Sequence, residues 1–209
     1  MDGLLIDSEP LWNEAANDAF LLFGKKLTAE EYASTTGLRT KEFVQHWFRQ
    51  FNWPLEACST VETKIINRVI ELVDKKGRPK PGVDYIFDFF AQRKFRIGLA
   101  SSSDMELIRL VVEKLELGHY LQAISSAALL PLGKPHPQVY LDCAALLNAT
   151  SDQCICFEDS FNGMIAAKAA KMKCVVVPSA LENQYPVWHA ADLKLSSLQN
   201  FNDLLLSSI

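Results

Sequence analysis

The sequence has no long apolar run and no basic-then-apolar start. No segment reaches the roughly 20 consecutive apolar residues that a bilayer-spanning helix needs, and the first residues do not follow the order of a signal peptide. We therefore expect a protein without membrane contact, located in the cytoplasm.

Dense basic clusters and a regular cysteine framework are also absent. The 21 Lys and Arg residues are dispersed in a chain of net charge -4, which argues against a nucleic-acid partner. Five cysteines at irregular spacings argue against a disulfide framework, and Cys154 and Cys156 flank Ile155 in a pattern that favours a strand face over a metal site. With 49% hydrophobic and 22% charged residues, the composition is that of a folded protein, and we expect a monomer that acts on a small molecule.

Helical periodicity dominates the chain from about Glu9 to Lys76. Apolar residues recur there at helical spacing, and no convincing strand interrupts them. The strongest break in the sequence follows at residues 77–82, which read Gly-Arg-Pro-Lys-Pro-Gly. The pattern predicts a helical unit that ends at this break.

The remainder of the chain alternates short apolar runs with amphipathic stretches. Strands are predicted at residues 96–101, 122–127, 154–159, 174–178 and 192–195, and helices at about 105–116, 137–147, 161–171 and 197–207. This alternation predicts an α/β fold, a Rossmann-like three-layer sandwich with a parallel central sheet. Ligands of such sheets bind beyond the carboxyl ends of the strands, so the residues that follow each strand are the candidates for chemistry.

Two adjacent carboxylates, Glu158 and Asp159, follow the predicted strand at 154–159. They repel each other unless a proton or a cation intervenes, and hard oxygen ligands of this kind suit Mg²⁺. The alternative is that Asp159 caps the next helix while Glu158 is solvated.

Lys134 and Ser101 are candidates for binding an anion. Lys134 lies in "GKPHP", where two prolines stiffen the loop and hold the ammonium in place. The alternative, that Lys134 is an ordinary surface lysine without a role in binding, has equal weight. Ser101 ends a strand, where its hydroxyl and the backbone N–H groups after it form an oxyanion cradle, or else a helix cap. Asp2, before Gly3, is a candidate proton donor and acceptor, although an Asp-Gly pair by itself signals only a turn.

The order of these motifs is more specific than any one of them. The segments "DGLLIDSEP", "GLASSS", "GKPHPQVYLDCAA" and "FEDSFNGMIAAKAAKM" resemble, in this order, the haloacid dehalogenase superfamily of phosphotransferases with an aspartate nucleophile. The sequence is similar in particular to its sugar-phosphate phosphatases of the 2-deoxyglucose-6-phosphate phosphatase type, neighbours of β-phosphoglucomutase. The resemblance implies a core of residues 1–8 and 79–209, a helical cap at residues 9–78, and Mg²⁺-dependent hydrolysis of a hexose or hexitol phosphate.

The resemblance also implies a role for each candidate residue. Asp2 would be the general acid and base and would offer its backbone carbonyl to Mg²⁺. Ser101 and Ser102 would bind the transferred phosphoryl group, and Lys134 would neutralise charge beside it. Glu158 and Asp159 would hold Mg²⁺ directly or through water.

The nucleophile of this family, an aspartate two places before the acid/base residue, is not in the sequence. Counting back from Asp2 places it immediately before Met1, and neither Asp7 nor Glu9 can replace it without rebuilding the loop. We therefore expect upstream residues in the native protein, together with a first strand whose absence leaves two neighbouring strands with unpaired edges.

Substrate contacts are expected from the cap. Arg39 and Lys41, in "TGLRTKE", are candidates to face the substrate, with a solvated helix start as the alternative. Trp12 is a third candidate for a substrate contact. It stands where the mutase relatives carry a cap histidine, which favours a phosphatase over the alternative, a β-phosphoglucomutase-like isomerase. If Met1 is the true start, an inactive module that binds phosphate and Mg²⁺ is the alternative from another class.

Overall fold

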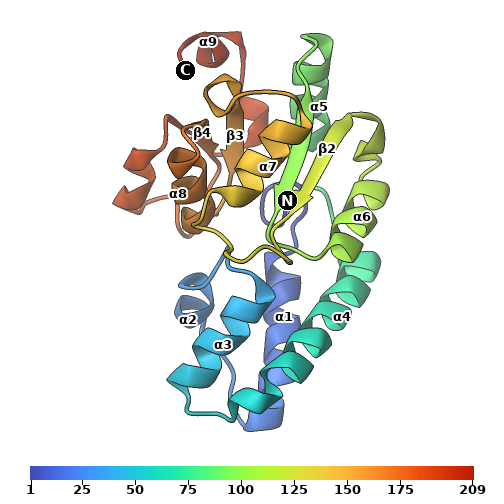
Figure 1. The fold of residues 1–209 in the computed structure, drawn as a ribbon, viewed down its shortest axis with the longest axis vertical. Coiled ribbons are helices and arrows are strands. Elements are labelled where there is room, and N and C mark those ends of the chain that lie inside the picture. Colours follow the sequence, from blue (N-terminus) through green and yellow to red (C-terminus); the bar gives the residue numbers. More distant parts are fainter.

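The computed structural model describes residues Met1–Ile209 as two stacked parts (Figure 1). The lower part in that view is built from helices, and the upper part contains all the strands with the remaining helices around them. None of the helices combines the length and the apolar character needed to cross a membrane.

The helical part forms around aromatic side chains. Phe20 is fully buried and stacks on Phe43 with ring centroids 5.7 Å apart, and Phe48 and Trp53 meet the Phe20 ring edge-on. Proline in the first turn of α1 and Gly77 after α4 mark the limits of this part. Its helices are α1 (Glu9–Phe20), α2 (Ala29–Ala33), α3 (Thr40–Gln50) and α4 (Cys58–Lys76).

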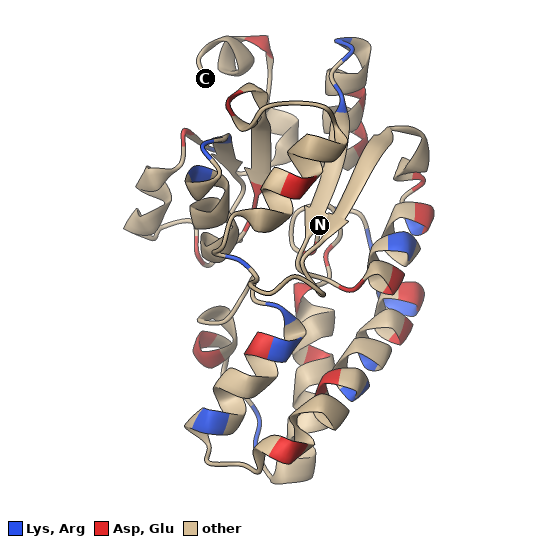
Figure 2. Ribbon diagram, viewed as in Figure 1, with Lys and Arg blue, Asp and Glu red and all other residues tan.

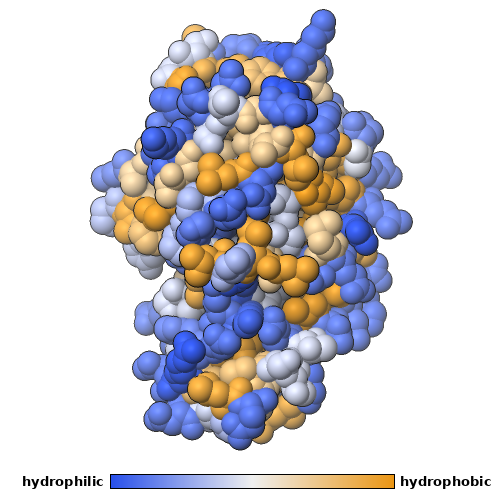
Figure 3. Space-filling model, in the orientation of Figure 1, coloured by the Kyte–Doolittle hydropathy of each residue, from blue (hydrophilic) through white to orange (hydrophobic).

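The surface of the helical part carries charges of both signs. Figure 2 shows basic residues alternating with acidic ones along α4, and Arg68 on this helix pairs with Glu14, Asp18 and Glu71. On the face seen in Figure 3, apolar residues are exposed in patches separated by polar ones.

The upper part confirms the predicted α/β class. All its strand pairs are parallel, and the strands lie within about two residues of the predicted ranges, as element boundaries usually do. The strands are β1 (Ile97–Ser101), β2 (Leu121–Ser126), β3 (Ile155–Glu158), β4 (Lys173–Val176) and β5 (Leu193–Lys194). The helices are α5 (Val83–Gln92), α6 (Met105–Lys114), α7 (Gln138–Leu146), α8 (Phe161–Ala169) and α9 (Asp203–Ser207).

The helix predicted over residues 197–207 is interrupted, so that prediction is wrong in part. A 3-10 turn at Leu198–Asn200 is followed by extended backbone at Phe201, whose ring is fully buried. The Asn202 side chain then accepts a hydrogen bond from the N–H of Leu205 and begins α9. Helix α5 was not predicted, although Val83, Ile86, Phe87 and Phe90 show the helical spacing of its buried face.

The strands form two sheets, and β1 and β3 carry the unpaired edges that the sequence predicts in the absence of a first strand. β1 pairs with β2, and β4 lies between β3 and β5, but β1 and β3 share no hydrogen bonds. The apolar residues that open the chain make a tight turn, because the N–H groups of Leu4, Leu5 and Ile6 all point to the carbonyl oxygen of Met1. A mainly apolar cavity of about 590 Å³ lies between β1 and β3.

The two connections between the parts run side by side. The N–H of Asp7 donates to the carbonyl of Arg78 at 2.8 Å, and the N–H of Lys80 donates to the carbonyl of Leu5 at 2.9 Å. We propose that this pair of connections bounds a cap of residues 9–78, with residues 1–8 and 79–209 as the core.

Candidate active site

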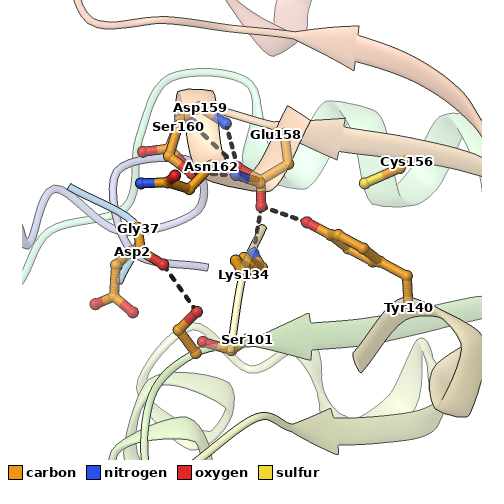
Figure 4. A network of polar contacts seen from close by, with 12 residues as sticks. Asp2, Gly37, Ser101, Lys134, Tyr140, Cys156, Glu158, Asp159, Ser160 and Asn162 are labelled. Carbon is orange, nitrogen blue, oxygen red and sulfur yellow. Dashed lines mark hydrogen bonds and ion pairs between the residues drawn. The ribbon is translucent and has the colours of Figure 1, made fainter. Parts of the chain in front are cut away.

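A pocket of about 80 Å³ lies between the helical part and the carboxyl ends of β1 and β3. The structure places most of the predicted site residues around it, as the close view in Figure 4 shows for several of them. Those that line it are Asp2, Trp12, Ser101, Ser102, Lys134, Glu158 and Asp159. Arg39 and Lys41 do not line it, and their predicted contact with substrate stays a prediction.

Asp2 is held in the pocket by three hydrogen-bond donors. Its Oδ1 accepts from Ser8 Oγ at 2.7 Å and from Trp12 Nε1 at 2.9 Å, and its Oδ2 accepts from Ser103 Oγ at 2.7 Å. Ser8 is fully buried at the entry to α1, and Ser103 follows β1. These donors fix the orientation of the carboxyl group in the pocket.

The serines after β1 take separate roles. Ser101 is buried, and its Oγ accepts from the N–H of Ser103 at 3.1 Å. Ser102 reaches the helical part, where its Oγ donates to the carbonyl of Gly37 at 3.0 Å. Helix α6 is capped by Asp104, which accepts from the N–H of Glu106, so Ser101 is not the helix cap.

Lys134 and Glu158 form a buried ion pair between the loop before α7 and the end of β3. The hydroxyl of Tyr140 also donates to Glu158, and the N–H groups of Asp159 and Ser160 donate to its Oε2 at 3.0 Å. Burial raises the pKa of Glu158, but the Lys134 ammonium and these donors outweigh burial and hold the pKa well below its usual range. Burial likewise lowers the pKa of Lys134, and the negative charge of Glu158 more than reverses that effect.

Asp159 contrasts with its neighbour, because its carboxylate accepts no hydrogen bond from the protein. Its burial in the pocket and the charge of Glu158 raise its pKa well above the usual range. Asp159 is not the cap of α8, because Ser160 fills that role by accepting from the N–H of Gly163 at 3.1 Å. The carboxylate instead approaches the turn at Gly3, where a Cβ would lie 1.9 Å from Asp159 Oδ2.

This arrangement fits a Mg²⁺ ion. No three His, Cys, Asp or Glu side chains are grouped as a ready metal site, so an ion would need backbone, water or substrate oxygens as well, and Mg²⁺ typically binds in that way. The carbonyl oxygen of Asp2 and the carboxylate of Asp159 both lack a hydrogen-bond donor. A cation there would relieve the unfavourable ionisation of Asp159.

Glu9 and Tyr32 also line the pocket, and the sequence reasoning missed both. Burial and the nearby charge of Asp2 raise the pKa of Glu9 to about 7. Burial, followed by the charges of Glu9 and Asp2, raises the pKa of the Tyr32 phenol as well. The sequence signal that could have identified Glu9 as a pocket residue was its position at the start of the helical part, directly after Ser8.

The chain matches known proteins over most of its length. Residues 1–177 match the model of the haloacid dehalogenase-like hydrolases. The chain is 41% identical over 199 residues to hexitol phosphatase B of Escherichia coli strain K12, an alignment that covers 95% of this chain and 90% of that protein. Among solved structures, it resembles CbbY from Rhodobacter sphaeroides in complex with phosphate, with a TM-score of 0.85, 21% identity and coverage of 96% and 92%. β-Phosphoglucomutase from Clostridium difficile has the same fold, with a TM-score of 0.85, 21% identity and coverage of 99% and 93%.

Proposed function

The chain belongs to the haloacid dehalogenase-like hydrolase family, and we propose that it is a phosphatase that hydrolyses the phosphate ester of a hexose or hexitol. The observation that carries the proposal is the convergence of Asp2, Lys134 and Asp159 on one pocket. The 41% identity to hexitol phosphatase B favours a small phosphorylated polyol or sugar as the substrate.

In the proposed reaction a carboxylate attacks the substrate phosphorus and the bond from phosphorus to the sugar oxygen breaks. Asp2 donates its proton to that oxygen as it leaves, and then removes a proton from the water that cleaves the phosphoaspartate. The attacking aspartate is expected one place before Met1, an expectation that comes from the family resemblance. The three donors around the Asp2 carboxyl group support its role, because they fix the position of the group that transfers the proton.

The phosphoryl group would be bound by residues of two loops. Ser101 and Ser102 would offer a hydroxyl and backbone N–H groups at the end of β1, and Lys134 would offer its ammonium. Glu158 holds that ammonium in place through their buried ion pair. Asp159 and the carbonyl of Asp2 would hold Mg²⁺, with Glu158 acting through water, and the ion would supply positive charge beside the phosphate.

The test is phosphate release by the native protein, expressed from its own gene with any codons that precede Met1. We expect release from hexitol and hexose phosphates in the presence of Mg²⁺, and far less from nucleoside monophosphates. Asp2→Asn should lower kcat by at least about 100-fold, because the leaving oxygen loses its proton donor. Circular dichroism and thermal unfolding of the variant serve as the control for folding.

Two other outcomes would contradict the proposal. Interconversion of glucose 1- and 6-phosphates without net phosphate release would identify a mutase. Binding of phosphate and Mg²⁺ with no turnover of any ester, and no effect of Asp2→Asn, would identify an inactive binding module.

A further inference from the structure

The loop of residues 35–39, between α2 and α3, touches the loops that carry the catalytic candidates. The carbonyl of Gly37 accepts from Ser102 after β1, and the carbonyl of Thr36 accepts from Asn162 Nδ2 at 3.0 Å at the start of α8. Gly37 lines the same pocket as Asp2 and Ser101, and all three are labelled in Figure 4. The third contact, made by Arg39, is the most extensive.

Arg39 extends from the helical part into the core. Its guanidinium donates to the carbonyl oxygens of Ala127 at 3.2 Å and Pro131 at 3.5 Å, and also to the carbonyl of Leu130. The residue is only 7% exposed. A buried guanidinium that binds three backbone carbonyls of one loop fixes the shape of that loop, because its donors form a rigid fork.

Glu42 completes the contact from the first turn of α3. It pairs with Arg39 at 2.5 Å and accepts from the N–H of Gly133 at 3.4 Å. Burial raises the pKa of Glu42, but the hydrogen bond and the charge of Arg39 outweigh burial, so the pKa lies below its usual value and the group stays ionised. Arg39 and Glu42 therefore bind the backbone at both ends of the segment 127–133, and this segment is followed directly by Lys134.

Position 133 requires a glycine because Arg39 and Glu42 occupy the space where a side chain would lie. A Cβ at Gly133 would lie 2.6 Å from Arg39 Nε and 2.7 Å from Glu42 Oε2. The backbone of Gly133 is not in the left-handed region, so the need for glycine is one of space. The core loop is thus shaped to receive the pair.

We propose that Arg39 and Glu42 form a latch that positions Lys134 when the helical part closes on the core. The latch holds the carbonyls of residues 127–131 and the amide of Gly133, and so sets the backbone from which the Lys134 ammonium reaches Glu158 and the phosphate. Arg39 is a positioning residue in this scheme and has no contact with the substrate. The proposal rests on the proposed phosphatase activity.

The experiment compares three substitutions in the native protein with one matched control. Arg39→Lys keeps the charge but loses the fork, Glu42→Gln keeps the shape but loses the charge, and Gly133→Ala displaces the pair without altering it. Arg68→Lys is the control, since Arg68 also binds several carboxylates but all of them lie in the helical part. Steady-state phosphate release and amide hydrogen exchange are measured for each protein.

We expect Arg39→Lys and Gly133→Ala to lower kcat by about tenfold with KM changed less than about twofold, because a displaced Lys134 weakens binding of the transition state. Glu42→Gln should have a smaller effect in the same direction. In all three variants the amides of residues 127–134 should exchange faster than in the wild type, while strand β4 stays protected. Arg68→Lys should change neither measurement.

Several results would overturn the latch. A rise in KM with kcat unchanged in Arg39→Lys would make Arg39 a substrate contact. Equal effects of Arg39→Lys and Arg68→Lys, or unchanged exchange at residues 127–134, would make the pair an ordinary ion pair. If the wild type releases no phosphate from any ester, the proposed function fails, and the exchange data alone still decide whether Arg39 holds the core loop.

Discussion

At the scale of single residues, the position of the Asp2 carboxylate depends on its neighbours. The indole of Trp12 supplies one of its three donors from the helical part, whereas Ser103 supplies another from the core. Trp12→Phe keeps an aromatic ring but removes the N–H, so Asp2 retains only its two serine donors. We expect kcat to fall about tenfold, since hydrogen bonds to charged groups contribute about 1.5 to 3 kcal/mol, and we expect little change in KM or in thermal unfolding.

Trp188 offers a matched control for this substitution. Trp188 is buried, whereas Trp12 is partly buried, and the Nε1 of Trp188 donates to the carbonyl of Glu182 at 2.7 Å, outside the pocket. Trp188→Phe should lower the unfolding temperature and leave kcat unchanged. If Trp12→Phe instead raised KM alone, Trp12 would act on the substrate, as the sequence reasoning predicts.

At the scale of elements, Asp192 ties α8 to β4 and β5. Its carboxylate accepts from Lys168 at 2.6 Å and from the N–H of Cys174 at 2.8 Å, and lies 3.7 Å from Lys173. Burial raises the pKa of Asp192, but these donors and charges outweigh burial, so the folded pKa lies below the ordinary value of 3.8. A depressed carboxyl pKa stabilises the fold above the unfolded pKa, and that stabilisation is lost as the pH falls through the folded pKa.

Asp192→Asn should therefore lower the free energy of unfolding by about 1 kcal/mol at neutral pH, a value already reduced for partial exposure. The difference between wild type and variant should shrink as the pH falls below 3.8. Urea unfolding over a pH series measures both effects. Asp152→Asn is the control, because Asp152 is exposed and forms no ion pair, and a gap that widened in acid would contradict the assignment.

Local patterns predicted the elements well where one rule decided the outcome. The strand that ends at Ser101 and the strand that ends at Glu158 were predicted because a short apolar run directly precedes polar residues. The interruption of the last helix at Phe201 was not predicted from the sequence. It arises because the Phe201 ring packs against Phe89, Phe90 and Phe157, which are distant in sequence. For the same reason the sequence indicated a basic Arg39 near the site, but its carbonyl partners 88 to 92 residues away could not be read from local spacing.

At the scale of the whole molecule, the upper part is divided by the cavity between β1 and β3. β4 has a hydrogen-bonded strand on each side, whereas β1 and β3 each have one. The lining of the cavity is mainly apolar, and no strand lies in it to accept hydrogen bonds from the free edges of β1 and β3. Backbone N–H groups on those edges therefore depend on water, which the unpaired edge of a strand always requires.

We therefore expect the protection of backbone amides to follow strand pairing more closely than depth in the fold. In a polypeptide of residues 1–209, which lacks the expected first strand, amides of β4 should exchange with solvent at rates near those of global unfolding. The amides of β1 and β3 that face the cavity should exchange at least about 100-fold faster, because they open without breaking a ladder hydrogen bond. Residue-resolved exchange by nuclear magnetic resonance measures this difference, and the amides of β1 that face β2 provide the internal control. Equal protection on both edges of β1 would show that its free edge is paired in solution and that the two sheets act as one.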